Sequence, residues 1–174
     1  AGLEGASEEE TVAFCERLFA DYLDGHRLLA NRSLWRRFPT VRCETWRHEN
    51  VILLGDAAHT AHFSVGSGTK LAMEDAIALA RELEEHGQND IPAMLESYEE
   101  NRWVDVVKVQ KAAQTSLEWF ENSARYMQQD PEQLTFNLMT RSKRITWDNL
   151  AARDPQLIET MAAWYRGKEL GADP

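Results

Sequence analysis

The four-residue run Val51-Ile-Leu-Leu54 constrains the fold of this chain more than any other segment. Every side chain in it is aliphatic, so it predicts a strand without a polar face, and such strands lie inside a sheet with both faces covered. Gly55 ends the run. The rest of the chain offers few partners for it, only weak strands over residues 31–46, where Pro39 interrupts the pattern. We therefore expect either a small irregular fold or a sheet whose other strands lie outside these 174 residues.

Helical spacing of apolar residues dominates the remainder of the chain. The first helix carries the Ser7-x-x-Glu10 pattern of a capping box, and two later helices begin at Asp-Pro pairs, with Asp as the N-cap and Pro in the first turn. The helices predicted in this way cover residues 8–24, 70–86, much of 91–127, and the segments that begin at Asp130-Pro131 and Asp154-Pro155. The expected fold class is mainly α with a few short strands.

Two apolar stripes are expected to supply the core between these helices. The first consists of Met73, Ala76, Ile77, Ala80 and Leu83. The second consists of Ile91, Leu95, Tyr98, Val106, Val109, Ala113, Leu117, Phe120, Ala124 and Met127. A helix as long as the second one usually bends or breaks.

Charge is spread unevenly over the chain, whose formal net charge is −10. Residues 1–26 have a net charge of −6, whereas residues 27–48 hold six arginines against one glutamate, a net +5. The acidic total excludes a general nucleic-acid-binding surface, but the arginine cluster permits one phosphate-bearing ligand. The alternative is that these arginines are solvated and pair with acids elsewhere.

Neither a membrane protein nor a secreted one is expected. No apolar run approaches the roughly 20 residues of a membrane span, and no basic-then-apolar leader is present. Cys15 and Cys43 provide no metal-site spacing and no disulfide framework, so reduced thiols in the cytoplasm are the expected state. Because the chain starts with Ala1 rather than Met, we expect it to be processed or cut from something longer.

The segment after the apolar strand is the one expected to carry chemistry. Asp56 stands at the carboxyl end of the strand, where α/β sheets bind ligands, and its carboxylate can accept hydrogen bonds from sugar or polyol hydroxyls. Gly66-Ser-Gly68 then opens a helix, whose first N–H groups suit a phosphate, a carboxylate or a delocalised anion. It is not a dinucleotide fingerprint, because the third glycine would fall at Leu71. Taken singly, each piece is more often a steric feature than a binding site.

Taken together, the pieces resemble the second FAD-binding motif of the single-component aromatic-ring monooxygenases. The resemblance rests on Leu54-Gly-Asp-Ala-Ala-His59, on two glycines seven and nine residues beyond His59, and on Glu74-Asp-Ala76 in the next helix. It implies an α/β FAD-binding monooxygenase fold, in which Asp56 binds the ribityl chain and backbone amides from Val65 to Thr69 face the pyrimidine edge of the flavin. The cofactor-binding residues implied are Gly55, Asp56, Val65, Gly66, Ser67, Gly68, Thr69 and Lys70.

Later segments resemble a narrower branch, the hydroxylases of aromatic acyl-CoA thioesters. These segments are Arg125-Tyr-Met127, Asp130-Pro-Glu132, Thr140-Arg-Ser-Lys-Arg-Ile145 and Arg153-Asp-Pro155, together with Phe63 and Lys70 where the wider family often has Pro and Asn. The resemblance implies hydroxylation of an aromatic small molecule, as its CoA thioester, with NAD(P)H and O₂. The flavin supplies the reactive oxygen, so no catalytic side chain is expected. We expect Arg32, Arg36, Arg37 or Arg42 to hold the CoA phosphates, because a guanidinium group pairs with phosphate oxygens in bidentate fashion.

The G-x-G-x-x-G strand-turn that holds the ADP part of FAD in this family has no counterpart in the chain. We therefore expect the C-terminal part of a monooxygenase module, inactive alone, whose partner is the missing N-terminal half of the flavin domain. Its expected regions are residues 1–50, a remnant of the substrate-domain side, residues 51–90, the second FAD-binding motif with its helix, and residues 91–174, the C-terminal helical region.

Two other interpretations stay open at this point. Asp56, His59 and His62 could be metal ligands, as in a metallophosphatase, although the other clusters that such a site needs are not visible. For His59 the simpler interpretation is a structural histidine that hydrogen-bonds the loop. The chain could also be a non-catalytic acidic helical interaction module, in which the Gly-Asp segment is only a fold element.

Overall fold

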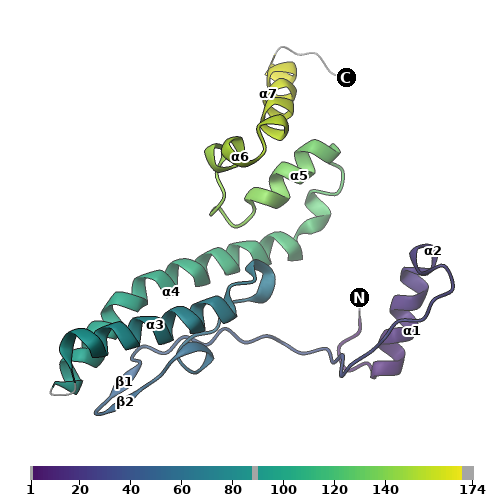
Figure 1. Cartoon of the computed structure of the whole chain (residues 1–174). Coiled ribbons are helices and arrows are strands. Elements are labelled where there is room, and N and C mark those ends of the chain that lie inside the picture. Colours follow the sequence, from purple (N-terminus) through teal and green to yellow (C-terminus); the bar gives the residue numbers. More distant parts are fainter. Residues whose placement is uncertain (1, 88–89, 170–174) are drawn as a thin grey trace. The chain divides into compact units, whose positions relative to one another are not determined.

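The structure, a computed structural model, describes residues 2–87 and 90–169. It divides into two compact units, Ala1–Pro39 and Thr40–Pro174. The elements in chain order are α1 (Glu8–Leu18), α2 (Ala20–Leu23), β1 (Arg47–His48), β2 (Val51–Ile52), the 3-10 turns η1 (Gly55–Ala57) and η2 (Phe63–Val65), α3 (Gly68–His86), α4 (Ile91–Glu121), the 3-10 turn η3 (Ser123–Arg125), α5 (Pro131–Thr140), α6 (Trp147–Arg153) and α7 (Pro155–Glu169) (Figure 1). The expected fold class, mainly α with few short strands, is confirmed.

The first unit consists of α1, the four-residue helix α2 that follows it directly after Phe19, and an extended return segment. The predicted capping box is present, because Ser7 N–H donates to Glu10 Oε2 at 2.8 Å and Glu10 N–H donates to Ser7 Oγ at 3.2 Å. The return segment is tied to α1 by the indole N–H of Trp35, which donates to Thr11 Oγ1 at 2.9 Å. The helix predicted over residues 8–24 is therefore two helices, α1 and α2.

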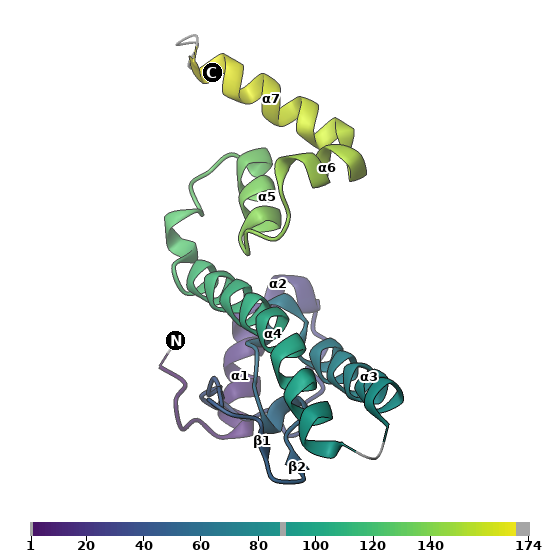
Figure 2. The same cartoon turned by 90° about the vertical axis from the view of Figure 1, so that its left-hand side faces the viewer.

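The second unit is built on α3 and α4, which pack side by side (Figures 1 and 2). The segment before α3 packs on both helices, and Trp46 from this segment is only 2% exposed. Trp46 joins Leu71 of α3 with Tyr98, Val106 and other residues of α4 in one hydrophobic cluster. The core of this unit thus lies between the two long helices and the chain that precedes them.

The apolar run from Val51 to Leu54 forms a shorter and less buried strand than the sequence predicts. β2 pairs antiparallel with β1, so that His48 lies opposite Val51. Val51 is 57% exposed, whereas Ile52 and Leu54 are partly buried against the core. The expected burial on both faces is wrong for this structure, because the face that carries Val51 is exposed. Within residues 2–87 and 90–169 the sheet consists of β1 and β2 alone.

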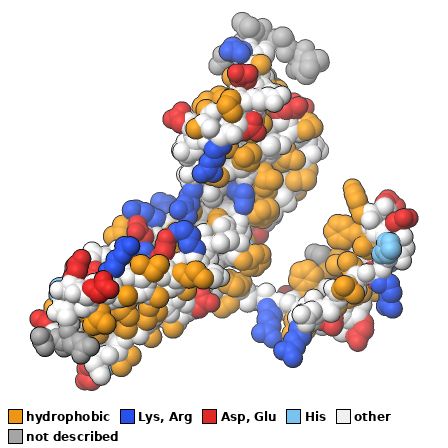
Figure 3. Space-filling model, in the orientation of Figure 1, with side chains coloured by type: hydrophobic (Ala, Val, Ile, Leu, Met, Phe, Trp, Pro, Cys, Tyr) orange, Lys and Arg blue, Asp and Glu red, His pale blue; other side chains and the backbone are white. Residues whose placement is uncertain are grey.

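The helix α3 turns a different face to the core than its apolar pattern predicts. Its buried face includes two acids, Asp75 and Glu82. The predicted core residues Met73, Ala76, Ile77, Ala80 and Leu83 are all exposed. Figure 3 shows hydrophobic side chains on the surface of this part of the second unit. On the buried face Asp75 pairs with Arg102 of α4. Apolar periodicity alone does not detect a polar contact of this kind between helices.

The helix α4 follows its prediction more closely. The stripe residues Leu95, Tyr98, Val106, Val109 and Ala113 are buried. The helix ends at Glu121, short of residue 127, and Phe120 and Met127 are exposed. α5 and α7 begin at the two predicted Asp-Pro pairs, whereas α6 was not predicted. None of the helices in the described part of the chain combines the length and apolarity that crossing a membrane requires.

Candidate functional site

The end of β2 leads into a turn whose first residue must be glycine. Gly55 has φ +55°, in the left-handed region, and a Cβ added to it would lie 3.0 Å from the Cβ of Ala72 in α3. Either feature alone disfavours a larger residue. The N–H of Gly55 donates to Asp75 Oδ2 at 2.9 Å, and its carbonyl accepts from the N–H of His59 at 2.9 Å. The hydrogen bond to Asp75 therefore holds the turn against α3.

Asp75 is the centre of a buried ionic network beneath this turn. Its side chain is fully buried, Oδ2 lies 2.8 Å from His59 Nε2, and Oδ1 accepts from Arg102 Nε at 2.9 Å. Burial by itself raises the pKa of Asp75, but hydrogen bonds from His59, from the Gly55 N–H and from Arg102 outweigh it and hold the pKa below its ordinary value. An ionised carboxylate only accepts hydrogen bonds, so His59 Nε2 carries the proton and donates it to Asp75 Oδ2.

Asp56 occupies the outer side of the same turn. Its side chain is exposed, and its carboxylate contacts no hydrogen-bond donor among the described residues. The neighbouring His59 is only 2% exposed, and its side chain bonds Asp75 of α3 rather than the loop as expected. Within the described ranges no three His, Cys, Asp or Glu side chains are grouped closely enough to hold a metal ion. The turn therefore presents one acceptor group, Asp56, on a rigid support.

The loop that enters α3 forms the second part of the site. After η2, Gly66 has φ +63° and directs the chain into the helix. Ser67 is buried, and its hydroxyl donates to the carbonyl of Val65 at 3.3 Å. α3 then begins at Gly68, so that the first N–H groups of the helix have no partner within it. The structure thus brings Val65, Gly66, Ser67, Gly68, Thr69 and Lys70 together in one turn at the N-terminus of α3.

Lys70 is exposed in the first turn of α3. Its ammonium group forms an ion pair with Glu74, one turn further along the helix. That pair lies on the surface, where such contacts contribute about 0–1 kcal/mol, so a ligand can compete for the ammonium group. The assignment of Lys70 as a cofactor-binding residue stays a prediction.

The four arginines predicted to hold phosphate groups are divided between the two units. Arg32, Arg36 and Arg37 are exposed in the first unit, where Arg37 pairs with Glu4 at 2.8 Å. Arg42 belongs to the second unit, and its guanidinium carbon lies 5.6 Å from the centre of the Trp103 ring. Arg36 and Arg37 line a cavity of about 410 Å³. Their phosphate-binding role stays a prediction.

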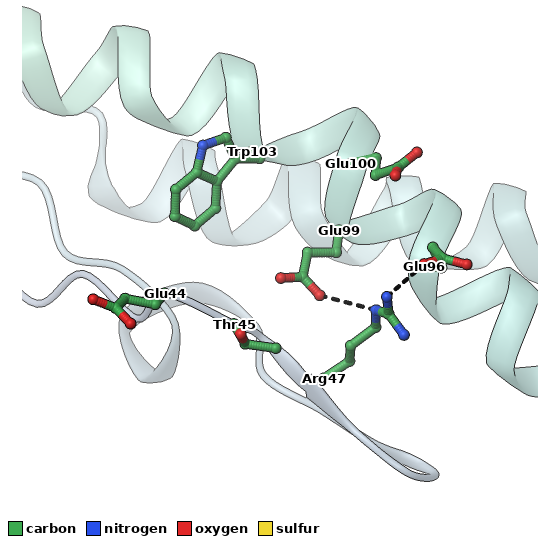
Figure 4. Close-up of a pocket in the computed structure, with 7 residues that line it drawn as sticks. All are labelled: Glu44, Thr45, Arg47, Glu96, Glu99, Glu100 and Trp103. Atoms are coloured by element: carbon green, nitrogen blue, oxygen red, sulfur yellow. Dashed lines mark hydrogen bonds and ion pairs between the residues drawn. The ribbon is translucent and has the colours of Figure 1, made fainter.

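A second cavity, of about 420 Å³, lies between the segment around β1 and α4 (Figure 4). Its lining residues are Glu44, Thr45, Arg47, Glu96, Glu99, Glu100 and Trp103. Arg47 points at two of the glutamates and pairs with Glu96 at 2.6 Å and with Glu99 at 3.2 Å. Four carboxylates against one guanidinium give this cavity a negative charge, which disfavours a phosphate-bearing ligand there.

Two residues of the site had no assigned role in the sequence. Asp75 stands in the Glu74-Asp-Ala76 segment that supported the resemblance, and that position was the available signal. Arg102, 27 residues further along and 7% exposed, had none, because a single arginine in a long helix is usually solvated.

Comparisons with known proteins identify the family to which the chain belongs. A family model described as an FAD binding domain matches residues 5–113. The salicyloyl-CoA 5-hydroxylase of a Streptomyces species is 45% identical over 163 residues, covering 92% of this chain and 31% of the relative. The 3-hydroxy-4-methyl-anthranilyl-[aryl-carrier protein] 5-monooxygenase of Streptosporangium sibiricum is 44% identical over 133 residues, covering 76% and 36%. The protodeoxyviolaceinate monooxygenase of Chromobacterium violaceum is 34% identical over 122 residues, covering 70% and 32%. The chain spans about a third of the length of these relatives.

Proposed function

Since this chain belongs to the FAD-binding domain family, we propose that it is part of an FAD-dependent aromatic-ring hydroxylase that uses NAD(P)H and O₂. The observation that carries the proposal is the exposed carboxylate of Asp56 beside Gly55, on a turn locked from behind by Asp75. The names of the related proteins, two monooxygenases and a hydroxylase, support it. The interpretation as a non-catalytic interaction module is not favoured.

In this proposal the residues of the chain bind and orient the flavin. Asp56 accepts hydrogen bonds from the ribityl hydroxyls, and the amides from Val65 to Thr69, with Lys70 beside them, face the pyrimidine edge. The partial positive charge at the N-terminus of α3 favours the electron-rich edge of the ring there. FAD supplies the redox chemistry with NAD(P)H and O₂, and the protein supplies position and electrostatics.

We further propose that the substrate is an aromatic acyl group in thioester linkage, and that Arg32, Arg36, Arg37 or Arg42 helps to hold the CoA phosphates. The name of one relative specifies a CoA thioester, and that of another an aryl group on a carrier protein. An N-terminal flavin segment that holds the ADP part of FAD is the proposed partner, with residues 1–50 on the substrate-domain side. The free thiols Cys15 and Cys43 fit a cytoplasmic setting.

The experiment that tests cofactor binding measures FAD retention in the full-length protein and in Asp56→Ala. Loss of the carboxylate leaves ribityl hydroxyls unpaired, so FAD binding should weaken by about 1–3 kcal/mol. Asp148→Ala is the matched control, because Asp148 is also an exposed acid in the first turn of a helix. Equal FAD retention in both variants would contradict the assignment of Asp56.

A kinetic comparison tests the substrate. The doubly substituted Arg36→Gln, Arg37→Gln protein should show a raised KM for an aromatic acyl-CoA and an unchanged flavin content. Turnover of the free aromatic acid as fast as its thioester, or an unaltered KM, would refute the CoA assignment and leave a plain aromatic hydroxylase.

A further inference from the structure

Arg141, directly after α5, reaches back to the loop that precedes α3. Its Nη2 donates to the carbonyl of Ser64 at 2.9 Å, and its Nε donates to the hydroxyl of Ser116 at 3.0 Å. Its Nη1 donates to the carbonyl of Leu138 at 2.7 Å, and its guanidinium carbon lies 5.0 Å from the centre of the Phe120 ring. All three nitrogens are engaged, so the group is fixed in one orientation.

The carbonyl of Ser64 is the point where these contacts converge. It accepts a hydrogen bond from Arg141 and a second, longer one from the hydroxyl of Ser116 at 3.4 Å. Ser116 is fully buried in α4. The hydroxyl of Ser64 in turn donates to the carbonyl of Ala113 at 3.2 Å. Ser64 is thereby tied to α4 on both its backbone and its side chain.

The Ser64 carbonyl belongs to the same peptide unit as the N–H of Val65. A peptide unit is planar and trans, so fixing the direction of its oxygen fixes the direction of its N–H. Gly66, the next residue, has no side chain, and nothing lies within 4 Å of a Cβ added to it. Ser64 and the buried Ser67 anchor the two ends of the loop, and between them Val65 packs against the core and the Gly66 N–H donates to the Phe63 carbonyl at 2.9 Å.

We infer that Arg141 is a positioning residue for the flavin: through the Ser64 carbonyl it sets the direction of the Val65 N–H and of the loop that enters α3. The inference rests on the proposed function, which places the amides from Val65 onward at the pyrimidine edge. It assigns a role to the Thr140–Ile145 segment, which lies outside the FAD motif and 77 residues from the carbonyl that Arg141 holds.

A purely structural role for Arg141, holding α5 against α4, predicts something different. Other contacts also hold α5, since the indole N–H of Trp119 in α4 donates to Asn137 Oδ1 at 2.9 Å and α5 packs against α7. Loss of Arg141 should therefore leave α5 in place and loosen the loop selectively.

The test compares Arg141→Ala and Arg141→Lys with the control Arg144→Ala in the full-length protein. Arg144 lies in the same segment, is exposed, and its guanidinium contacts no acceptor among the described residues. Hydrogen exchange of the amides from Val65 to Ser67 should be at least tenfold faster in Arg141→Ala, with α3 and α4 unchanged. Reduced flavin should bind about tenfold more weakly relative to oxidised flavin, which lowers the two-electron potential by about 30 mV. Added guanidinium ion should restore the slow hydrogen exchange and the potential in Arg141→Ala. The Arg141→Lys variant should keep both defects, because lysine lacks the planar fork of arginine.

Unchanged hydrogen exchange at Val65 to Ser67 would overturn the inference. A uniform rise in exchange through α4 and α5 would also overturn it, because that result would show a structural role only. The proposed function is decided separately, by the flavin content of the unsubstituted protein. Absence of FAD there would refute the flavin assignment and its positioning residue together, whereas normal FAD content with an unshifted potential would refute Arg141 alone.

Discussion

Replacing Asp75 with asparagine keeps the size of the side chain and removes the negative charge from the buried network. Arg102 is 7% exposed and His59 is 2% exposed, so neither reaches water when its partner becomes neutral. Breaking a buried ion pair from one side costs about 3–5 kcal/mol, because the remaining charge is left uncompensated. Arg102 keeps two weaker partners, Glu74 at 3.5 Å and Asp105 at 3.9 Å. We therefore expect a loss near the lower limit, about 3 kcal/mol.

Urea unfolding of the full-length protein, followed by tryptophan fluorescence, measures this loss, since Trp46 packs on His59 with ring centres 4.9 Å apart. The matched control is Glu4→Gln, whose side chain lies outside the network, is 80% exposed and pairs with Arg37 at 2.8 Å. An exposed pair contributes about 0–1 kcal/mol, so the control should be nearly neutral. A loss below about 1 kcal/mol in Asp75→Asn would refute the central role given to this carboxylate.

The remaining predictions concern the same turn. Because the folded pKa of Asp75 lies below its ordinary value of 3.8, the contribution of this carboxylate to the free energy of unfolding is complete above pH 3.8 and is lost as pH falls through the folded pKa. The difference in stability between the unsubstituted protein and Asp75→Asn should therefore shrink below about pH 4. A difference that stays constant to lower pH would contradict the lowered pKa. Gly55→Ala should destabilise by about 2–4 kcal/mol in the same urea assay, from left-handed strain together with the clash against Ala72. Gly25→Ala, at φ +78° with nothing within 4 Å, isolates the strain alone and should cost about 1–2 kcal/mol; equal losses in the two variants would exclude the clash.

The features that the sequence predicted well depend on local signals. The helix start at Ser7 needs only the Glu three residues later, and the Asp-Pro pairs at 130 and 154 need only their own backbone chemistry. Gly55 follows β2, and the helix that Gly66-Ser-Gly68 opens begins two residues before its predicted start. These signals lie within a few residues of the structure that they specify.

The features that the sequence did not predict depend on contacts between distant residues. On the buried face of α3, Asp75 pairs with Arg102, which lies 27 residues further along the chain, whereas the apolar residue Met73 is exposed. The contact between Arg141 and Ser64 spans 77 residues and follows no periodicity. Hydrophobic patterning assigns apolar residues to the core and has no means to recognise a buried face that is charged.

Asp56 in the turn and Asp75 in α3 beneath it carry the same charge but lie in different surroundings. Asp75 lies in the second turn of α3, where an uncompensated negative charge would weaken the positive potential at the N-terminus of that helix. Arg102 and the hydrogen bonds from His59 and Gly55 neutralise its effect, so the carboxylate fastens the turn without opposing an anionic ligand. Asp56 has no such partner among the described residues and remains available to hydroxyl groups. The buried Asp75 thus holds the turn rigid, while the exposed Asp56 leaves the same turn able to bind a ligand.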